Sequence, residues 1–215
     1  MLTKTKLCLI TNRKLLTLPH LSEDLDSTLD RLLLFCLQAA QAGVDIIQIR
    51  EKDLSAKKLA DFVTKLTSLT SSTTKTSILV NDRLDIALSC GATGVHLPSN
   101  SFPIKDVRKL VGNKFIISQS THSIEEAKLA ADQGADFILF SPIFNTPSKQ
   151  TFGKPLGLEL LKQAINVVNC PIIALGGISR QNASSVLECG VAGLAAIRLF
   201  IETSNLAELV NDLKQ

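Results

Sequence analysis

Aromatic residues are scarce in this chain of 215 residues, which contains nine Phe and neither Trp nor Tyr. Surfaces that bind nucleic acid use aromatic rings to stack bases and clustered basic side chains to neutralise phosphates. The formal net charge is only +3, and the basic residues are scattered along the chain. We therefore expect no nucleic-acid partner.

Long apolar runs are missing as well. No run approaches the length of a membrane span, and the N-terminal segment lacks the apolar core of a signal peptide. The five cysteines are odd in number and lack CxxC spacing, so we interpret them as small buried residues of a reducing compartment. These absences predict a cytoplasmic protein without a membrane partner.

The hydrophobic content of 45% predicts a single domain over residues 1–215. A repeated unit runs through this domain. In each copy a helix-like segment ends on glycine and an apolar run follows at once. The glycines are Gly43, Gly91, Gly134 and Gly190. Each interval between copies holds two strand-plus-helix units, so the four copies predict eight units.

Eight short apolar runs have the character of parallel strands that are buried on both faces. They are Leu7 to Ile10, Ile46 to Ile49, Ile78 to Val80, Gly94 to Leu97, Phe115 to Ile117, Phe137 to Phe140, Ile172 to Leu175 and Leu194 to Ile197. Segments with helical spacing of apolar residues lie between them. The pattern predicts a single-domain (β/α)8 TIM barrel, with an open doubly wound sheet as the alternative.

Helix starts are marked by three serines. Ser123 and Glu126 form a capping box, in which each side chain satisfies a backbone N–H group of the first turn. Ser55 and Ser179 are weaker candidates of the same kind. Because active sites of TIM barrels lie at the carboxyl ends of the strands, the loops that precede these helices are the places to look for chemistry.

Polar residues follow the second and third strands. Gln48 and Arg50 face the same side of their strand and can grip an anion, to which Lys52 adds a mobile positive charge. The alternative is a solvated loop with internal Arg/Glu pairing. Asn81 and Asp82 follow the third strand, where the acid can hold a divalent cation or cap the next helix.

The fifth and sixth strands lead to a histidine and to a long loop. His122 precedes the predicted helix cap and can exchange protons near neutral pH, although surface histidines are commoner than catalytic ones. The loop from Ser141 to Pro155 offers Thr146, Ser148 and Lys149 as donors to phosphate oxygens, unless it is a mobile surface loop.

The seventh strand ends in Gly176 and Gly177, just before the predicted helix start at Ser179. Two glycines let a backbone approach a ligand closely, and helix N-termini favour anions. This position in a barrel is a frequent phosphate site, so phosphate binding is favoured over a simple tight turn.

Taken together, seven segments occur in an order that is typical of one group of barrels. They are QIREK at 48–52, NDR at 81–83, GVHL at 94–97, STHS at 120–123, PIFNTPSK at 142–149, PLGLE at 155–159 and ALGGI at 174–178. The chain therefore resembles the thiamine phosphate synthase and TenI superfamily of TIM barrels.

The resemblance implies binding of small phosphorylated thiamine precursors. In the synthase branch, a pyrimidine pyrophosphate ionises with the help of Mg²⁺ and the nitrogen of thiazole phosphate captures the carbocation. The resemblance assigns the pyrophosphate grip to Gln48, Arg50, Lys52, Asn81 and Lys149, ligand contacts to Ser120, Thr146 and Ser148, the thiazole phosphate site to Gly177, and one of two metal-binding acids to Asp82.

Two positions depart from the synthase pattern. The second metal-binding acid is replaced by Ser101, which weakens a site for a hard cation. The surrounding LPSNSF stretch resembles the TenI branch, whose activity is the metal-independent aromatisation of a thiazole phosphate tautomer. At the eighth strand, Arg198 stands where the family often has serine, and it can either bind phosphate or fill the barrel mouth.

Three functions follow from these features. The leading expectation is a TenI-like thiazole tautomerase without a cofactor, which binds phosphate at Gly176, Gly177 and Arg198 and uses His122, with Lys52, for proton transfer. The first alternative is a thiamine phosphate synthase that binds Mg²⁺ through Asp82. The second is a protein that binds thiazole phosphate or thiamine phosphate without turnover. The oligomeric state, including a homo-oligomer, is left open.

Overall fold

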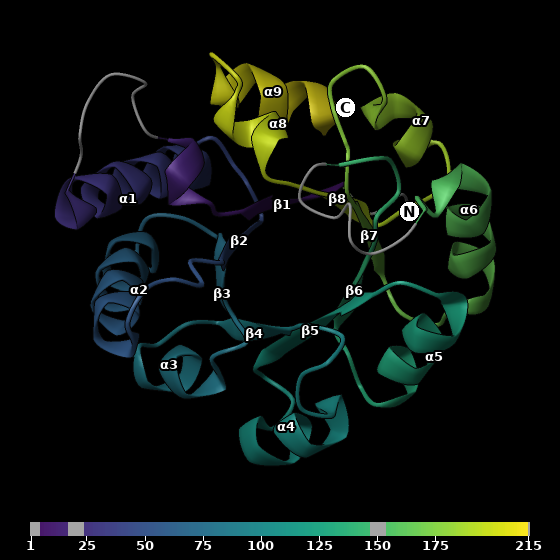
Figure 1. The fold of residues 1–215 in the computed structure, drawn as a ribbon, viewed down its shortest axis with the longest axis horizontal. Coiled ribbons are helices and arrows are strands. Elements are labelled where there is room, and N and C mark those ends of the chain that lie inside the picture. The colour runs from purple at the N-terminus through teal and green to yellow at the C-terminus, as the bar shows by residue number, and fades with distance from the viewer. Residues whose placement is uncertain (1–4, 17–23, 147–153, 215) are drawn as a thin grey trace.

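A computed structural model describes residues 5–16, 24–146 and 154–214. Its eight strands are all parallel and form a closed barrel in chain order, with β8 paired to β1 (Figure 1). The strands are β1 (Lys6–Ile10), β2 (Ile46–Ile49), β3 (Ser77–Asn81), β4 (Gly94–Leu97), β5 (Ile116–Thr121), β6 (Phe137–Phe140), β7 (Ile172–Leu175) and β8 (Gly193–Ala196). The predicted TIM barrel is confirmed, and the open sheet is wrong.

Helices surround the barrel and alternate with its strands (Figure 1). They are η1 (Arg13–Leu15), α1 (Leu25–Gln41), α2 (Ala56–Thr70), α3 (Leu84–Ser89), α4 (Ile104–Val111), α5 (Ile124–Asp132), α6 (Gly157–Val167), α7 (Ala183–Leu187), α8 (Arg198–Ile201) and α9 (Leu206–Leu213). The repeated glycines follow α1, α3, α5 and α7, and all four have a positive φ, between 69° and 94°. The repeat therefore marks every second βα unit, as predicted.

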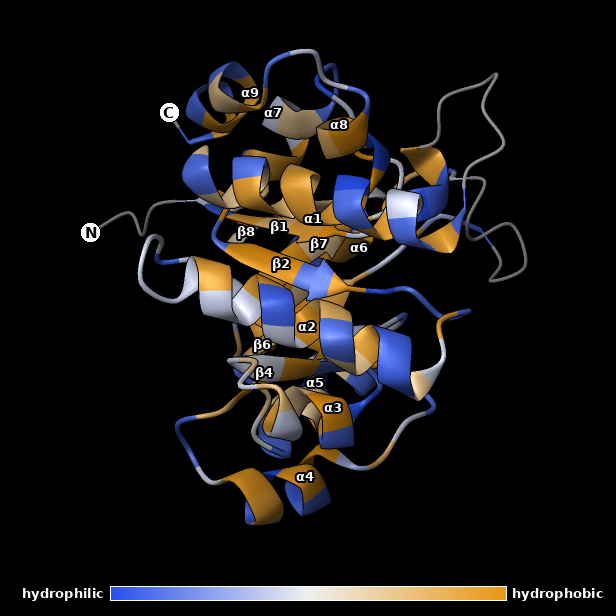
Figure 2. Ribbon diagram, turned by 90° about the vertical axis from the view of Figure 1, so that its left-hand side faces the viewer, coloured by the Kyte–Doolittle hydropathy of each residue, from blue (hydrophilic) through white to orange (hydrophobic). Residues whose placement is uncertain are grey.

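Two apolar layers hold the fold together. The larger one lies between the strands and the surrounding helices, and the smaller one fills the barrel from residues such as Cys8, Leu79, Leu139 and Ile173. Figure 2 shows apolar residues along the strands, whereas the surrounding helices carry both apolar and polar residues. The alternation of each strand thus sends one set of side chains outward to the helices and the other into the barrel.

Strand β5 is longer than the sequence predicts. Polar side chains from Ser118 onward suggest a loop, but the backbone continues to pair with β6 as far as Thr121. Ladder hydrogen bonds come from the backbone and do not require apolar side chains. As a result, Ser118 and Ser120 belong to the barrel wall.

Two of the three predicted helix starts are confirmed. The side chains of Ser55 and Ser123 accept hydrogen bonds from the N–H groups three residues further on, as N-caps do. The start at Ser179 is wrong, because α7 begins only at Ala183. Asn182 is the reason: its Oδ1 accepts the N–H of Ser179 at 2.9 Å and closes a turn ahead of the helix.

Candidate active site

One arc of the wall at the barrel mouth carries polar side chains, which together form the polar arc. Its members face inward from four neighbouring strands: Gln48 on β2, Asn81 on β3, His96 on β4, and Ser118 and Ser120 on β5. Gln48 Nε2 donates to Asn81 Oδ1 at 3.1 Å, which fixes both amides. The structure thus brings Gln48 and Asn81, predicted for the pyrophosphate grip, onto the same arc of the wall as Ser120, predicted as a ligand contact.

The opposite arc of the barrel is apolar. It is formed by Ile10 on β1, Leu139 on β6, Ile173 on β7 and Ala195 on β8, all of them buried. A heterocycle with one charged substituent matches such a surface, because its ring can pack on the apolar arc while its polar groups meet the polar arc.

His96 is an inward-facing residue of the polar arc that the sequence interpretation missed. It is 2% exposed, and its ring nitrogens lie 2.9 Å from the hydroxyl oxygens of Ser118 and Ser120. The signal was present in the GVHL segment, where alternation places the histidine on the same face as Gly94. Without the register between strands, however, an inward polar face could not be told from an outward one.

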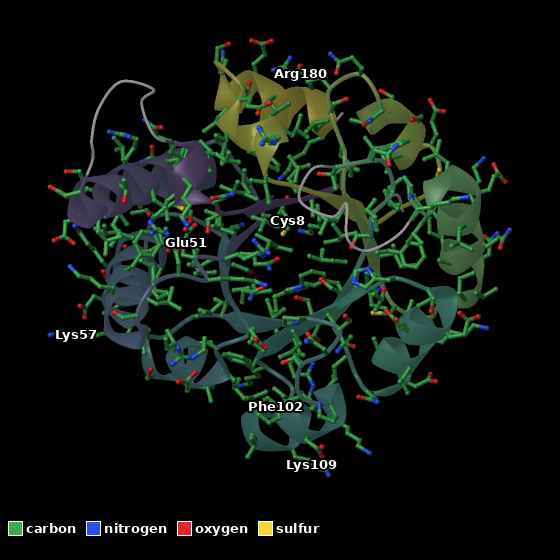
Figure 3. All side chains as sticks on the ribbon, viewed as in Figure 1. Cys8, Glu51, Lys57, Phe102, Lys109 and Arg180 are labelled. Atoms are coloured by element: carbon green, nitrogen blue, oxygen red, sulfur yellow. The ribbon has the colours of Figure 1, made fainter. Side chains whose placement is uncertain are left out.

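The loop after β2 is anchored to the loop after β1 by a buried ion pair. Arg13 Nη1 donates to Glu51 Oε2 at 3.0 Å, and the same guanidinium binds both carboxylate oxygens of Asp53. Glu51 is only 5% exposed and lies beside α1 and α2 within the outer rim (Figure 3). The alternative of a solvated loop with internal Arg/Glu pairing is therefore wrong for Glu51, whose partner is Arg13.

The anchored loop after β2 contains Arg50 and Lys52, the two cationic side chains predicted to bind an anion. Arg50 is half-buried, and its backbone N–H donates to Thr11 Oγ1 at 2.9 Å. Lys52 is exposed in the same loop. Because the residues on either side of Lys52 are held by Arg13, the loop presents its positive charges from a fixed backbone.

Asp82 lies exposed at the end of β3 with a left-handed backbone, φ 61°. Its Oδ1 accepts a hydrogen bond of 2.6 Å from Ser101 Oγ, in the connection between β4 and α4. It does not cap α3, whose N-cap position is Arg83 and has no capping side-chain bond. Within the described residues, no group of three or more His, Cys, Asp or Glu could hold a metal ion.

His122 is half-buried just beyond β5 and is fixed by two contacts. Its backbone N–H donates to Glu126 Oε2 at 2.7 Å. The Glu126 side chain of the capping box therefore bonds the N–H of His122 and not that of Ser123. Its Nδ1 lies 2.6 Å from the carbonyl oxygen of Ser141, which can only accept. Nδ1 therefore carries the proton, and Nε2 is the basic nitrogen of the ring.

Gly176 and Gly177 pack directly against the loop that follows β6. Their φ angles are 103° and 66°, and Phe144 N–H donates to the Gly176 carbonyl at 3.0 Å. A Cβ on Gly177 would lie 2.6 Å from the carbonyl oxygen of Asn145. The pair is thus needed to seat this loop, in addition to its predicted role toward phosphate.

The structure describes only some of the remaining residues that were predicted to contact the ligand. Thr146 is half-buried in the same loop, whereas Ser148 and Lys149 lie outside the described residues. Arg198 begins α8 on the exposed side, where its Nη1 donates to Glu202 Oε1 at 2.8 Å. An i,i+4 ion pair of this kind holds the guanidinium along its own helix.

The family can now be identified from comparison with known proteins. A sequence model of the family described as thiamine monophosphate synthase matches residues 21–200. The chain belongs to this family. It is 40% identical over 197 residues to the "Putative thiamine-phosphate synthase 2" of Aquifex aeolicus, covering 92% of this chain and 98% of that one.

Two further matches extend this result to the family's named synthases and to a solved structure. The thiamine-phosphate synthase of Clostridium acetobutylicum is 37% identical over 192 residues, 89% of this chain and 85% of that one. The thiamine phosphate pyrophosphorylase of Pyrococcus furiosus has a TM-score of 0.81 and 29% identity, covering 98% and 94% of the two chains. The resemblance to the superfamily is confirmed. The two sequence relatives carry the synthase name, and none of the three proteins carries that of a tautomerase.

The protein is thus a member of an enzyme family of thiamine biosynthesis. Its expected preference for the TenI branch receives no support from these relatives, whose names favour the synthase alternative. Among the described helices, none is long and apolar enough to cross a membrane.

Proposed function

We propose that this protein is a thiamine-phosphate synthase, which joins hydroxymethylpyrimidine pyrophosphate to thiazole phosphate and releases pyrophosphate. The observation that carries the proposal is the hydrogen bond between Gln48 and Asn81 on neighbouring strands, with Arg50 following Gln48 by two residues at the carboxyl end of β2. Amide and guanidinium groups in this arrangement suit a pyrophosphate, which a thiazole tautomerase does not use. The five free cysteines agree with a cytoplasmic location.

The roles of the residues follow from the reaction. The bond between the pyrimidine methylene carbon and the pyrophosphate oxygen breaks, its electron pair leaves with pyrophosphate, and the thiazole nitrogen forms the new C–N bond. Arg50 and Lys52 stabilise the charge that develops on the leaving group. The apolar arc keeps water away from the electron-poor carbon until the nitrogen attacks.

The donor set at Asp82 fits a Mg²⁺ ion that arrives with pyrophosphate. Mg²⁺ keeps several waters and commonly takes one or two carboxylates together with substrate phosphates. Asp82 would be the single carboxylate, with the Ser101 hydroxyl beside it. When bound, the ion supplies positive charge that neutralises the departing pyrophosphate.

The proposal is tested with purified protein, both precursors and Mg²⁺, by measuring thiamine phosphate and pyrophosphate after chromatography. We expect equal amounts of the two products, and a loss of about ten-fold or more in kcat/KM for Gln48→Ala, which removes an amide from the grip. Gln163→Ala, on the exposed face of α6, is the matched control. Absence of thiamine phosphate under these conditions contradicts the proposal.

A thiazole tautomerase is the second candidate, favoured by one observation. In the neutral imidazole the proton on His122 Nδ1 is held by the Ser141 carbonyl, so Nε2 has the chemical form of a general base. Aromatisation of the thiazole phosphate tautomer above the buffer rate, lost in His122→Asn, would establish it. Asn retains a donor to Ser141 but lacks the base. Ligand-dependent thermal stabilisation without turnover in either assay would instead indicate a binding protein.

A further inference from the structure

His96 bridges two serines of the neighbouring strand inside the polar arc. Its Nδ1 lies 2.9 Å from Ser118 Oγ, and its Nε2 lies 2.9 Å from Ser120 Oγ. Ser118 is fully buried, whereas Ser120, two residues further along β5, is half-buried toward the mouth. The three side chains form a chain of hydrogen bonds that leads from the barrel interior to the site.

The direction of the hydrogen bonds in this chain follows from Ser118. Within the described residues, His96 is the hydrogen-bond partner of the Ser118 hydroxyl, and β5 pairs through its backbone with both β4 and β6. A buried O–H group without an acceptor is destabilising, so Ser118 donates to Nδ1. In a neutral imidazole the other nitrogen then carries the proton, and Nε2–H donates to Ser120 Oγ.

The geometry points to His96 and Ser118 as positioning residues that make Ser120 a hydrogen-bond donor to the bound precursor. Since Ser120 accepts its bond from His96, its own proton is directed toward the ligand. The preferred ligand atom is then an acceptor, such as a ring nitrogen or a phosphate oxygen. A ligand that presents N–H at this point would be disfavoured. The identity of the ligand rests on the proposed function, whereas the proton arrangement does not.

The proton arrangement is tested by NMR of the full chain labelled with ¹⁵N-histidine. The chain has three histidines, so His20→Gln and His122→Gln variants assign the His96 signals. We expect a pyridine-like Nδ1 and a pyrrole-like Nε2 for His96. Ser118→Thr, which keeps the hydroxyl, retains this pattern, and Ser118→Ala loses it. A proton on Nδ1 in the unmodified protein overturns the inference.

Kinetics test the consequence for the ligand. In Ser118→Ala we expect the hydrogen bond from Ser120 to the bound precursor to be lost. KM for the pyrimidine pyrophosphate should then rise about ten-fold, with kcat changed by less than about two-fold. Ser118→Thr restores KM. Thr121→Val on the same strand is the matched control, because its buried hydroxyl faces away from the barrel and has no hydrogen-bond partner among the described residues.

The two measurements separate the two proposals. An unchanged KM in Ser118→Ala overturns the positioning role even if thiamine phosphate is formed. If the unmodified protein forms no thiamine phosphate, the proposed function fails, and the dissociation constant for thiazole phosphate replaces KM in the same set of variants. The NMR result for His96 stands in either case.

Discussion

Ser101 Oγ donates a hydrogen bond of 2.6 Å to the carboxylate of Asp82. The two residues come from different βα connections, after β4 and after β3. The resemblance to the synthases implies a second metal-binding acid at the position of Ser101. A hydroxyl fixes the orientation of Asp82 but adds no negative charge, so the pair attracts a divalent cation less strongly than two carboxylates would.

The variant Ser101→Asp therefore adds the missing charge beside Asp82. We expect it to lower the Mg²⁺ concentration for half-maximal activity by about ten-fold, since a second carboxylate adds an anionic ligand. Without metal the two carboxylates repel, and Tm falls in EDTA. Ser99→Asp, at an exposed position of the same connection, is the control for charge alone. Equal Mg²⁺ dependence in both variants would contradict this explanation.

Loss of Arg13 is expected to destabilise the barrel strongly. In Arg13→Leu, Glu51 stays buried without its cation, which costs about 3–5 kcal/mol in the free energy of unfolding. Lys14, whose side chain is exposed and pairs with Asp53, provides the comparison, and Lys14→Leu should cost about 1 kcal/mol or less. Urea denaturation measures both values. Similar losses in the two variants would show that burial of the pair is unimportant.

Asp53 gives the fold a dependence on acid pH. Hydrogen bonds from Arg13 and Lys14 lower the pKa of its carboxyl well below the usual range. A pKa that is lower in the folded state stabilises the fold above the unfolded value of about 4, and this stabilisation is lost as the pH falls further. Asp53→Asn should therefore show a shallower loss of Tm below about pH 4. Because 43% of the side chain is exposed, solvent screening keeps the effect modest. An unchanged slope would contradict this assignment.

Gly177→Ala tests the contact between the Gly-Gly turn and the loop after β6. The new Cβ would lie 2.6 Å from Asn145 O, so the loop must move. We expect a loss of about 2–3 kcal/mol and a higher KM for thiazole phosphate. Gly112 has the same φ of 66° but open space around it, so Gly112→Ala reports backbone strain alone. If both variants lose the same stability, the contact with the loop has no energetic role.

Lys214→Met tests a clamp at the opposite end of the barrel from the mouth. Lys214 Nζ lies 2.7 Å from Asp45 Oδ2 and donates to the Gly43 carbonyl at 2.6 Å. Both side chains of the pair are largely buried, so the substitution should cost about 2 kcal/mol in unfolding free energy. Turnover should be unchanged, because the clamp lies at the amino ends of the strands. A large drop in kcat with an unchanged Tm would contradict this.

Features encoded within a few residues were predictable from the sequence. The buried runs, the left-handed glycines and the Ser123 cap each depend on local backbone preference and periodicity. The start of α7 was missed although it is also local, because the Asn182 side chain competes with the helix by bonding the Ser179 N–H.

Features that depend on several strands were harder to predict. The choice of Arg13 as the partner of Glu51 joins residues 38 positions apart, and the bond between Ser101 and Asp82 joins two loops. The inward placement of His96 depends on its register with β3 and β5. Residue type indicated polar chemistry at the mouth, whereas the partners were set by barrel closure.

The Asp45 carboxylate also binds Lys6 at 3.2 Å and accepts the backbone N–H of Leu7 at 3.0 Å. One side chain thus ties the first strand to Lys214, just beyond the last helix. Asp45 lies directly before β2, which pairs with one edge of β1, while β8 closes the barrel on the other edge. Detachment of either end of the described chain breaks a bond to Asp45, the residue that also holds the other end. We therefore expect the two ends to detach cooperatively when the barrel opens.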